Sequence, residues 1–218
     1  MKILAVSDRK DPGLWDYYSK DKTKGVELIL SCGDLSNNYL EFLVTMVNRP
    51  LVYVRGTHDE SARETPPEGC DCLEDEVLII KGLRIAGLGG SMKYKKSQEM
   101  YTEAQMCKRV RKLKKMIDRY GGFDILVTHA PVKGFGDGED LPHQGFECFK
   151  ELIDLYHPYC LIHGHMHEEY GNFERIHEYN GTKIINACGK IILDIPDELC
   201  SHVQRMTIKE RIAKFFHD

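Results

Sequence analysis

Short apolar runs, most of them bounded by Gly, Asp or Pro, alternate with amphipathic stretches along the chain. Runs of this length that are rich in β-branched residues are typical of buried strands. Two pairs of runs meet at Lys81-Gly82 and at Asn180-Gly181, which are hairpin turn signals. The predicted strands cover 2–7, 27–32, 51–55, 76–80, 83–88, 124–128, 159–164, 173–179, 182–187 and 190–195.

Stretches with helical periodicity separate these strands. After Ser36, a capping residue, apolar side chains recur at i, i+3, i+4 and i+7. A longer stretch carries an apolar stripe beside a basic face at 108–119 and stops at Gly121-Gly122. The predicted helices cover 14–20, 36–48, 98–120, 144–156 and 201–216.

The order of these elements predicts the fold class. Strands and helices alternate in the first half of the chain, and hairpins dominate later. This order is typical of an α/β (α+β) fold in which two mixed sheets pack face to face with helices outside. No shift in composition marks a boundary, so residues 1–218 are expected to form a single domain.

Five of the apolar runs lead into an aspartate or a histidine. Because the ligand crevice of an α/β sheet lies outside the carboxyl ends of its strands, we expect these side chains to meet at one edge. Carboxylate oxygen and imidazole nitrogen together are the ligands of hydrolytic Zn, Mn or Fe centres. The residues that follow the five runs are Asp8, Asp34, His58-Asp59, His129 and His165-Met166-His167.

The order and spacing of these motifs resemble the calcineurin-like metallophosphoesterases. The matching pieces are D-x-x at 8–10, GD at 33–34, G-x-HD at 56–59, TH at 128–129 and GHMH at 164–167. The resemblance therefore spans residue 1 to about 190, and GHMH is its most specific piece. It implies a four-layer αββα sandwich with two central mixed β-sheets, which agrees with the predicted elements.

The resemblance also implies a centre of two metal ions. Asp34 would bridge both ions, and Asp8 and His167 would bind the first of them. His129 and His165 would bind the second. Two divalent or trivalent ions of Mn, Fe or Zn would suit such a set, because mixed nitrogen and oxygen sites accept each of these metals.

A catalytic pair is implied as well. His58 would stand beside the leaving group, and Asp59 would pair with its imidazole and orient it. The reaction would be hydrolysis of a phosphate ester by a metal-bound hydroxide, which forms near neutral pH when water binds such ions.

Two positions depart from the family pattern. Lys10 stands where the family has the histidine of D-x-H, and Thr57 where it has the asparagine of GNHD. An ammonium group has no lone pair to donate, so the first site is expected to have reduced affinity. Lys10 could instead extend into solvent or contact a substrate phosphate. The Thr57 hydroxyl could bind an ion weakly or hold a water.

Composition narrows the functional classes. The net charge of -4 gives no general attraction to nucleic acid, and the basic helix face lacks interleaved aromatic residues. No apolar run approaches the ~20 residues of a membrane span, and a strand at residue 2 leaves no room for a signal peptide. The eight cysteines select no disulfide pattern and are interpreted as reduced thiols in a cytoplasmic protein.

We therefore expect a metal-dependent phosphoesterase that acts on a small phosphomonoester or phosphodiester. The alternative is a weakly active or inactive relative that serves for binding or as a scaffold, and Lys10 and Thr57 support it. Substrate choice would depend on the loops 91–97 and 131–143, where His143 is a candidate lid residue. His163 is interpreted as a core or supporting histidine. The oligomeric state does not follow from the sequence.

The two departures make a direct prediction. The double variant Lys10→His, Thr57→Asn should bind more metal per chain and turn over esters faster, because it restores an imidazole and an amide oxygen. Elemental analysis and p-nitrophenyl phosphate hydrolysis measure both quantities. A variant that matches the wild type in both would show that the two residues do not weaken the centre.

Overall fold

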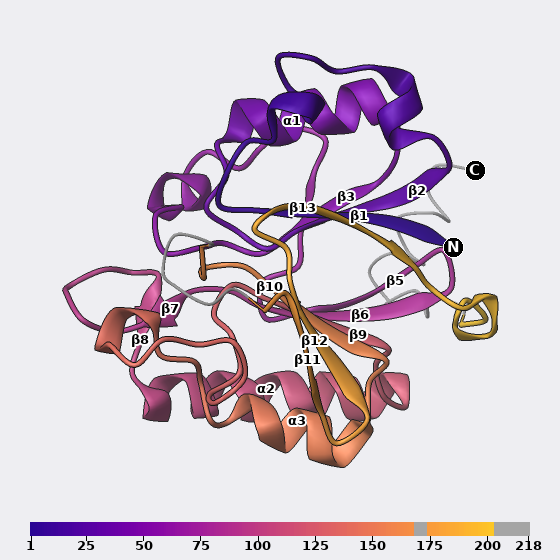
Figure 1. Cartoon of the computed structure of the whole chain (residues 1–218). Coiled ribbons are helices and arrows are strands. Elements are labelled where there is room, and N and C mark those ends of the chain that lie inside the picture. Colours follow the sequence, from indigo (N-terminus) through magenta and orange to yellow (C-terminus); the bar gives the residue numbers. More distant parts are fainter. Residues whose placement is uncertain (168–173, 203–218) are drawn as a thin grey trace, which may run out of the picture.

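The computed structural model describes residues 1–167 and 174–202. In this part of the chain two large β-sheets lie face to face, with helices on both outer sides (Figure 1). The helix expected over 201–216 falls almost wholly outside the described residues.

The first sheet has the strand order β13-β1-β2-β3-β4. Its first four strands along the chain are mutually parallel, and β13 runs antiparallel beside β1. Because Ser7 pairs with Gly189, β13 begins at the edge where β1 ends. The strands are β1 (Lys2–Ser7), β2 (Val26–Ser31), β3 (Leu51–Tyr53), β4 (Asp71–Cys72) and β13 (Gly189–Asp194).

The second sheet has the order β11-β12-β10-β9-β6-β5. Both predicted hairpins are present, and the residue pairs Lys81-Gly82 and Asn180-Gly181 have the positive φ angles of a tight hairpin turn. The four inner strands β12, β10, β9 and β6 are parallel. The strands are β5 (Val77–Ile80), β6 (Leu83–Leu88), β9 (Ile125–Thr128), β10 (Cys160–His163), β11 (Ile176–Tyr179) and β12 (Thr182–Asn186).

Side chains alternate between two cores along the central strands. In β1, Ile3 and Ala5 pack between the two sheets, whereas Leu4 and Val6 pack beneath α1 (Asn37–Val47). The helices α2 (Glu103–Tyr120) and α3 (Phe149–Tyr156) cover the outer face of the second sheet. The layer order α, β, β, α confirms the predicted sandwich with two mixed sheets.

Two helices begin later than predicted. The long helix begins at Glu103 rather than 98, because Thr102 and Gln105 form a capping box and 100–101 are extended. The expected helix over 144–156 begins at Phe149. Its first turn is capped by the Glu103 carboxylate, which accepts hydrogen bonds from the backbone N–H groups of Glu147 and Cys148. A local capping box therefore decides where the first of these helices starts, whereas a side chain distant in sequence caps the second.

The helix expected over 14–20 is wrong. The chain there forms two separate 3-10 turns, Pro12–Leu14 and Lys20–Thr23. Only Leu14 of the first turn is buried, so there is no apolar face to extend it. The other short elements are β7 (Ser91–Met92), β8 (Met100–Tyr101) and the 3-10 turns Glu60–Arg63, Leu141–His143 and Asp197–Leu199. Among the described residues no helix is long and apolar enough to cross a membrane.

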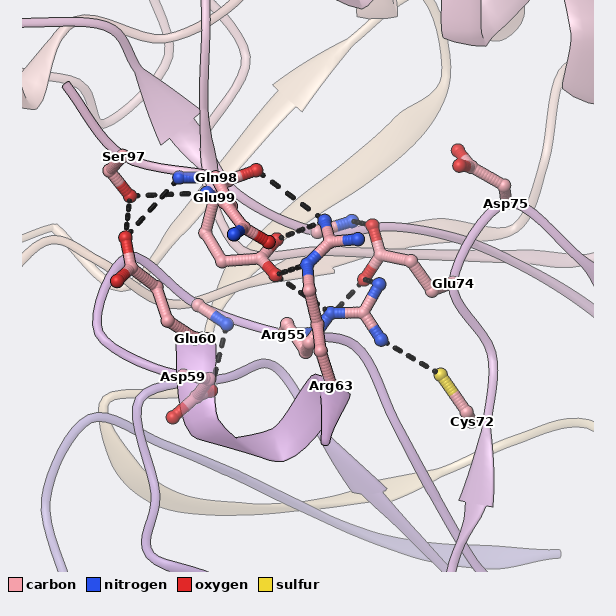
Figure 2. Close-up of polar contacts among 12 residues, drawn as sticks. Arg55, Asp59, Glu60, Arg63, Cys72, Glu74, Asp75, Ser97, Gln98 and Glu99 are labelled. Carbon is pink, nitrogen blue, oxygen red and sulfur yellow. Dashed lines mark hydrogen bonds and ion pairs between the residues drawn. The ribbon is translucent and has the colours of Figure 1, made fainter. Parts of the chain in front are cut away.

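A buried ion-pair network anchors the loop that follows β3 (Figure 2). Glu99 is fully buried and accepts from Arg55 at 2.9 Å and from Arg63, so it ties the start of this loop to the turn after it. Arg109, which the sequence places in the basic helix stretch, is also buried and pairs with Glu74 and with Asp75 at 2.8 Å. The residues Thr57-His58-Asp59 lie between Arg55 and Arg63, so this network holds their loop in place.

We expect Glu99→Gln to lower the free energy of unfolding by about 3 kcal/mol, because it removes one partner of a buried ion pair. Urea denaturation measures the change. The matched variant Glu27→Gln, at an exposed pair with Lys81, should cost less than about 1 kcal/mol. Equal effects of the two substitutions would contradict a stabilising role for the network.

Candidate metal centre

The predicted site residues follow the carboxyl ends of strands from both sheets. Asp8 follows β1, Asp34 follows β2, His129 follows β9, and His165 and His167 follow β10. Asp8, Asp34 and His165 have φ angles of 62°, 56° and 68°, in the left-handed region. Non-glycine residues adopt this conformation rarely and at a cost of about 1–3 kcal/mol each. The strained turns point these side chains to one edge of the sandwich.

The ends of the two sheets approach each other closely at this edge. A Cβ atom on Gly164 would lie 1.9 Å from Ser7 Oγ, so only glycine allows β10 to pass β1 there. Close by, the backbone N–H of His165 donates to both carboxylate oxygens of Asp8 at 3.0 Å. The second sheet is thus hydrogen-bonded to an acidic residue of the first.

Asp8 is the acidic residue at the centre of this edge. Its side chain is 1% exposed, and Oδ1 lies 3.4 Å from Nε2 of His167. Burial disfavours the carboxylate, but the contacts with His167 and the charge of His129 keep the pKa of Asp8 below its usual value. Asp8 is therefore an anion buried among imidazoles, which is the condition of a metal ligand.

His129 and Asp34 form the second close contact. The fully buried His129 places Nδ1 2.7 Å from the Cys32 carbonyl oxygen, which can only accept, so Nδ1 carries a proton. Nε2 then faces Asp34 Oδ2 at 3.4 Å. Burial acts to lower the pKa of His129, but the Asp34 carboxylate outweighs it and raises the pKa to about 9. The same contact keeps the pKa of Asp34 well below its usual value despite burial.

Thr57 lies between the two histidines assigned to the second ion. Its Oγ1 is 3.1 Å from Nε2 of His129 and 3.5 Å from Nδ1 of His165. The other nitrogen of His165, Nε2, donates to the Pro142 carbonyl at 2.8 Å, which leaves Nδ1 as the acceptor. Burial, with the charge of His129, lowers the pKa of His165 to about 4. Both imidazoles therefore point the nitrogen that no carbonyl holds at the Thr57 hydroxyl.

His58 and Asp59 make different contacts in the site. The exposed His58 side chain lines the cavity, and its backbone N–H donates to Asp34 Oδ1 at 2.7 Å. The resemblance would pair Asp59 with the His58 imidazole. In this structure Asp59 Oδ2 accepts from the backbone N–H groups of Asp34 at 2.7 Å and Gly56 at 2.8 Å, so its carboxylate joins two loops of the site.

Lys10 lies away from this group of ligands. Its ammonium stands 4.6 Å from the centre of the Trp15 ring. It lines a separate pocket of about 490 Å³ with Arg9, Arg175 and Lys190. Of the three interpretations of Lys10, the geometry favours a side chain that extends to the surface.

A cavity of about 860 Å³ opens over the candidate ligands. Asp8, Asp34, His165 and His167 form part of its wall, and the loop side chains Tyr94 and His143 complete it. Nδ1 of His143 lies 2.7 Å from Asp140, within the loop expected to act as a lid. His163, by contrast, is fully buried in the core, where its Nδ1 contacts the Gly164 carbonyl oxygen at 2.9 Å.

Cys188 belongs to this edge, and sequence reasoning missed it. One ligand atom each from Asp8, His167 and Cys188 lies within 4.8 Å of the others. Because the residue adjoins an apolar run, its local sequence is that of a core cysteine. The signal that could have found it is the direction of β13, which runs antiparallel to β1: a residue just before β13 lies at the edge where β1 ends.

The donor set fits metal ions. Ligand atoms of Asp8, Asp34 and His129 also lie within 4.8 Å of one another, and the two aspartates line the open cavity. Carboxylate and imidazole donors suit Zn, Mn and Fe alike. A histidine whose second nitrogen is fixed by a carbonyl, as in His129 and His165, is the usual arrangement around a bound metal.

Comparison with known proteins gives the family. The model of the calcineurin-like phosphoesterase superfamily domain matches residues 1–193, so the chain belongs to this superfamily of metal-dependent phosphoester hydrolases. A search of curated proteins finds no match.

Solved structures share the fold. One crystal structure superposes with a TM-score of 0.66 at 16% identity and covers 88% of this chain and 94% of its own. The crystal structure of TT1561 of Thermus thermophilus has a TM-score of 0.59 at 17% identity and covers 86% of this chain and 88% of its own. At these identities the likeness concerns the fold alone.

The raised pKa of His129 makes the stability of the chelator-treated protein dependent on pH. The folded protein binds the proton with a pKa of about 9, against 6.5 for an ordinary histidine. The His129–Asp34 pair therefore makes its full contribution to the free energy of unfolding below pH 6.5, and this contribution is lost as the pH rises through about 9. Urea denaturation at several pH values should show this decline, and His129→Gln should reduce it. An unchanged decline in the variant would argue against the pair.

Proposed function

We propose that this protein hydrolyses a small phosphate ester at a centre of two metal ions. The observation that carries the proposal is the approach of ligand atoms of Asp8, Asp34 and His129 to within 4.8 Å of one another, where Asp8 and Asp34 line the 860 Å³ cavity and His129 is buried beside them. Asp34 would bridge the ions, and Asp8 with His167 would hold the first. His129 and His165 would hold the second. Mn, Fe and Zn all suit these donors.

The residues of the chain would prepare the reaction in two ways. The Cys32 and Pro142 carbonyls each hold one nitrogen of a second-site histidine, so that the other nitrogen faces the centre. His129 would release the proton that it carries on that nitrogen when an ion binds. The strained loops bring carboxylates from one sheet and imidazoles from the other into one cavity. When bound, the two ions supply Lewis acidity, which polarises the phosphate and acidifies the attacking water.

His58 would assist the leaving group. Its imidazole is exposed at the cavity wall, next to the backbone N–H that binds Asp34. When the bond from phosphorus to the ester oxygen breaks, a proton from this imidazole would convert the departing alkoxide into an alcohol. Asp59 would contribute indirectly, because its carboxylate holds the backbone on both sides of the site.

One observation favours a second candidate, a relative with weak activity. The Thr57 hydroxyl stands between His129 and His165 and also lies 2.8 Å from Ser91 Oγ. A hydroxyl engaged in this way is a weaker ligand than an amide oxygen, so the second ion would be held less tightly. The cavity would then bind phosphate esters without fast turnover.

The free cysteines and the size of the cavity bear on where the protein acts and on what. All eight cysteines are free, which suits the reducing cytoplasm. A cavity of about 860 Å³ with a polar wall suits a small phosphate ester better than a macromolecule.

Hydrolysis tests the proposal. The chain reconstituted with Mn²⁺ should cleave p-nitrophenyl phosphate or its bis ester, and Asp34→Asn should abolish turnover and lower the metal content. His58→Ala should lower kcat by about 10²–10⁴ at unchanged metal content, as expected for loss of a general acid. The control is His157→Asn, at an exposed helix end, which should behave as the wild type. Tight metal binding without turnover would favour the second candidate, and absence of both would overturn the proposal.

A further inference from the structure

The first metal site of the family pattern lacks one ligand in this chain. The position of its histidine is taken by Lys10, and the Lys10 ammonium packs over Trp15 outside the cavity. Of the residues carried over from the family, only Asp8, His167 and the shared Asp34 remain for that ion. A three-ligand site can bind, but another donor close to Asp8 and His167 would complete it.

Cys188 lies where such a donor would have to be. Its Sγ is within 4.8 Å of ligand atoms of both Asp8 and His167, and the residue is 2% exposed. Its backbone is fixed on both sides: the N–H donates to Asn186 Oδ1 at 2.8 Å, and the carbonyl accepts from Arg175 at 3.2 Å. The thiol is therefore held in place by the start of β13 rather than by a flexible loop.

We propose that Cys188 is a ligand of the first metal ion and takes the place of the missing imidazole. This inference rests on the proposed function, because it assumes an ion at Asp8 and His167. The thiol loses its proton when the ion binds, and the proton passes to solvent. A thiolate beside Asp8 adds negative charge to the site, and Arg9 and Arg175, which line the same pocket as Cys188, bring positive charge near it.

A thiolate ligand changes which metal the site prefers. Sulfur is a soft donor that selects Zn²⁺ and disfavours Mn²⁺, whereas carboxylate and imidazole alone accept both. We therefore expect the first site to prefer zinc. The second site, which holds only oxygen and nitrogen donors, should lack this preference.

A second cluster in the described chain also contains thiols, so the experiment must distinguish it from the cluster around Cys188. Ligand atoms of Glu103, Cys107 and Cys148 also lie within 4.8 Å of one another. Here the Glu103 carboxylate already accepts from the two backbone N–H groups that begin α3, so its oxygens are used by the fold. Cys107 is half-buried and does not line the cavity, which makes Cys107→Ser a matched control for Cys188→Ser.

Cobalt spectroscopy tests the proposal without an activity assay. The full chain is stripped of metal with chelator and titrated with Co²⁺ in the absence of oxygen. Bound cobalt produces visible ligand-field bands with any ligand, whereas only a thiolate adds a charge-transfer band in the near ultraviolet. We expect that band in the wild type and in Cys107→Ser, and its loss in Cys188→Ser. Zn²⁺ affinity should fall by at least about tenfold in Cys188→Ser, since even indirect metal partners are worth that much. Mn²⁺ affinity should change less.

The outcomes separate the two proposals. Cobalt binding and ester hydrolysis without a charge-transfer band in the wild type would overturn the Cys188 ligand and leave the phosphoesterase standing. A band that persists in Cys188→Ser and disappears in Cys107→Ser would assign it to the other cluster and also overturn the inference. A band that depends on Cys188, without hydrolysis in any metal form, would support the ligand and overturn the proposed function. No cobalt binding at all would overturn both.

Discussion

The contact between the ends of the two sheets is the constraint on which the candidate site depends. Asp8, from the first sheet, accepts hydrogen bonds from the backbone of His165, from the second, and Gly164 lets the strands pass closely enough for this. His129 makes a similar crossing contact with the Cys32 carbonyl. Neither sheet alone holds both the carboxylates and the second-site imidazoles. A shift of one sheet against the other by one residue would therefore dismantle the site while leaving each sheet intact.

The candidate site combines strained backbone with buried charged side chains, and the surrounding structure stabilises both. Asp8, Asp34 and His165 adopt left-handed conformations that an isolated chain would avoid. Asp59 holds the backbone of two of the loops involved, and the buried pairs of Glu99 with Arg55 and Arg63 hold the turn beyond them. The core between the sheets keeps the strands rigid, so that the strained turns do not relax. The polar residues around the site are thus organised to preserve its geometry as well as to react.

The departures from the family pattern acquire different meanings in three dimensions. The substitution at Lys10 places no ammonium among the candidate ligands, because the Lys10 side chain lines a neighbouring pocket. The substitution at Thr57 lies inside the site, because the Thr57 hydroxyl stands between two histidines. Cys188 is a candidate for compensation, since it lies beside the residues that Lys10 leaves short of a partner. In a comparison of sequences alone these three positions would count equally, although they differ in their relation to the metal centre.

The sequence by itself determined the elements and the order of the ligands. Periodicity located the strands and hairpins, and the polar residues at strand ends identified Asp8, Asp34, His129 and His165 as neighbours, because strand ends meet at a sheet edge. Sequence patterns did not predict contacts between distant residues. The start of α3 depends on the Glu103 carboxylate, and the Asp59 carboxylate accepts from the backbone of another loop. The direction of the Lys10 side chain and the approach of Cys188 to Asp8 and His167 were also not predicted from the sequence. Only the tertiary structure decides them, because local pattern reports which face a residue occupies, whereas a contact depends on how two sheets are placed against each other.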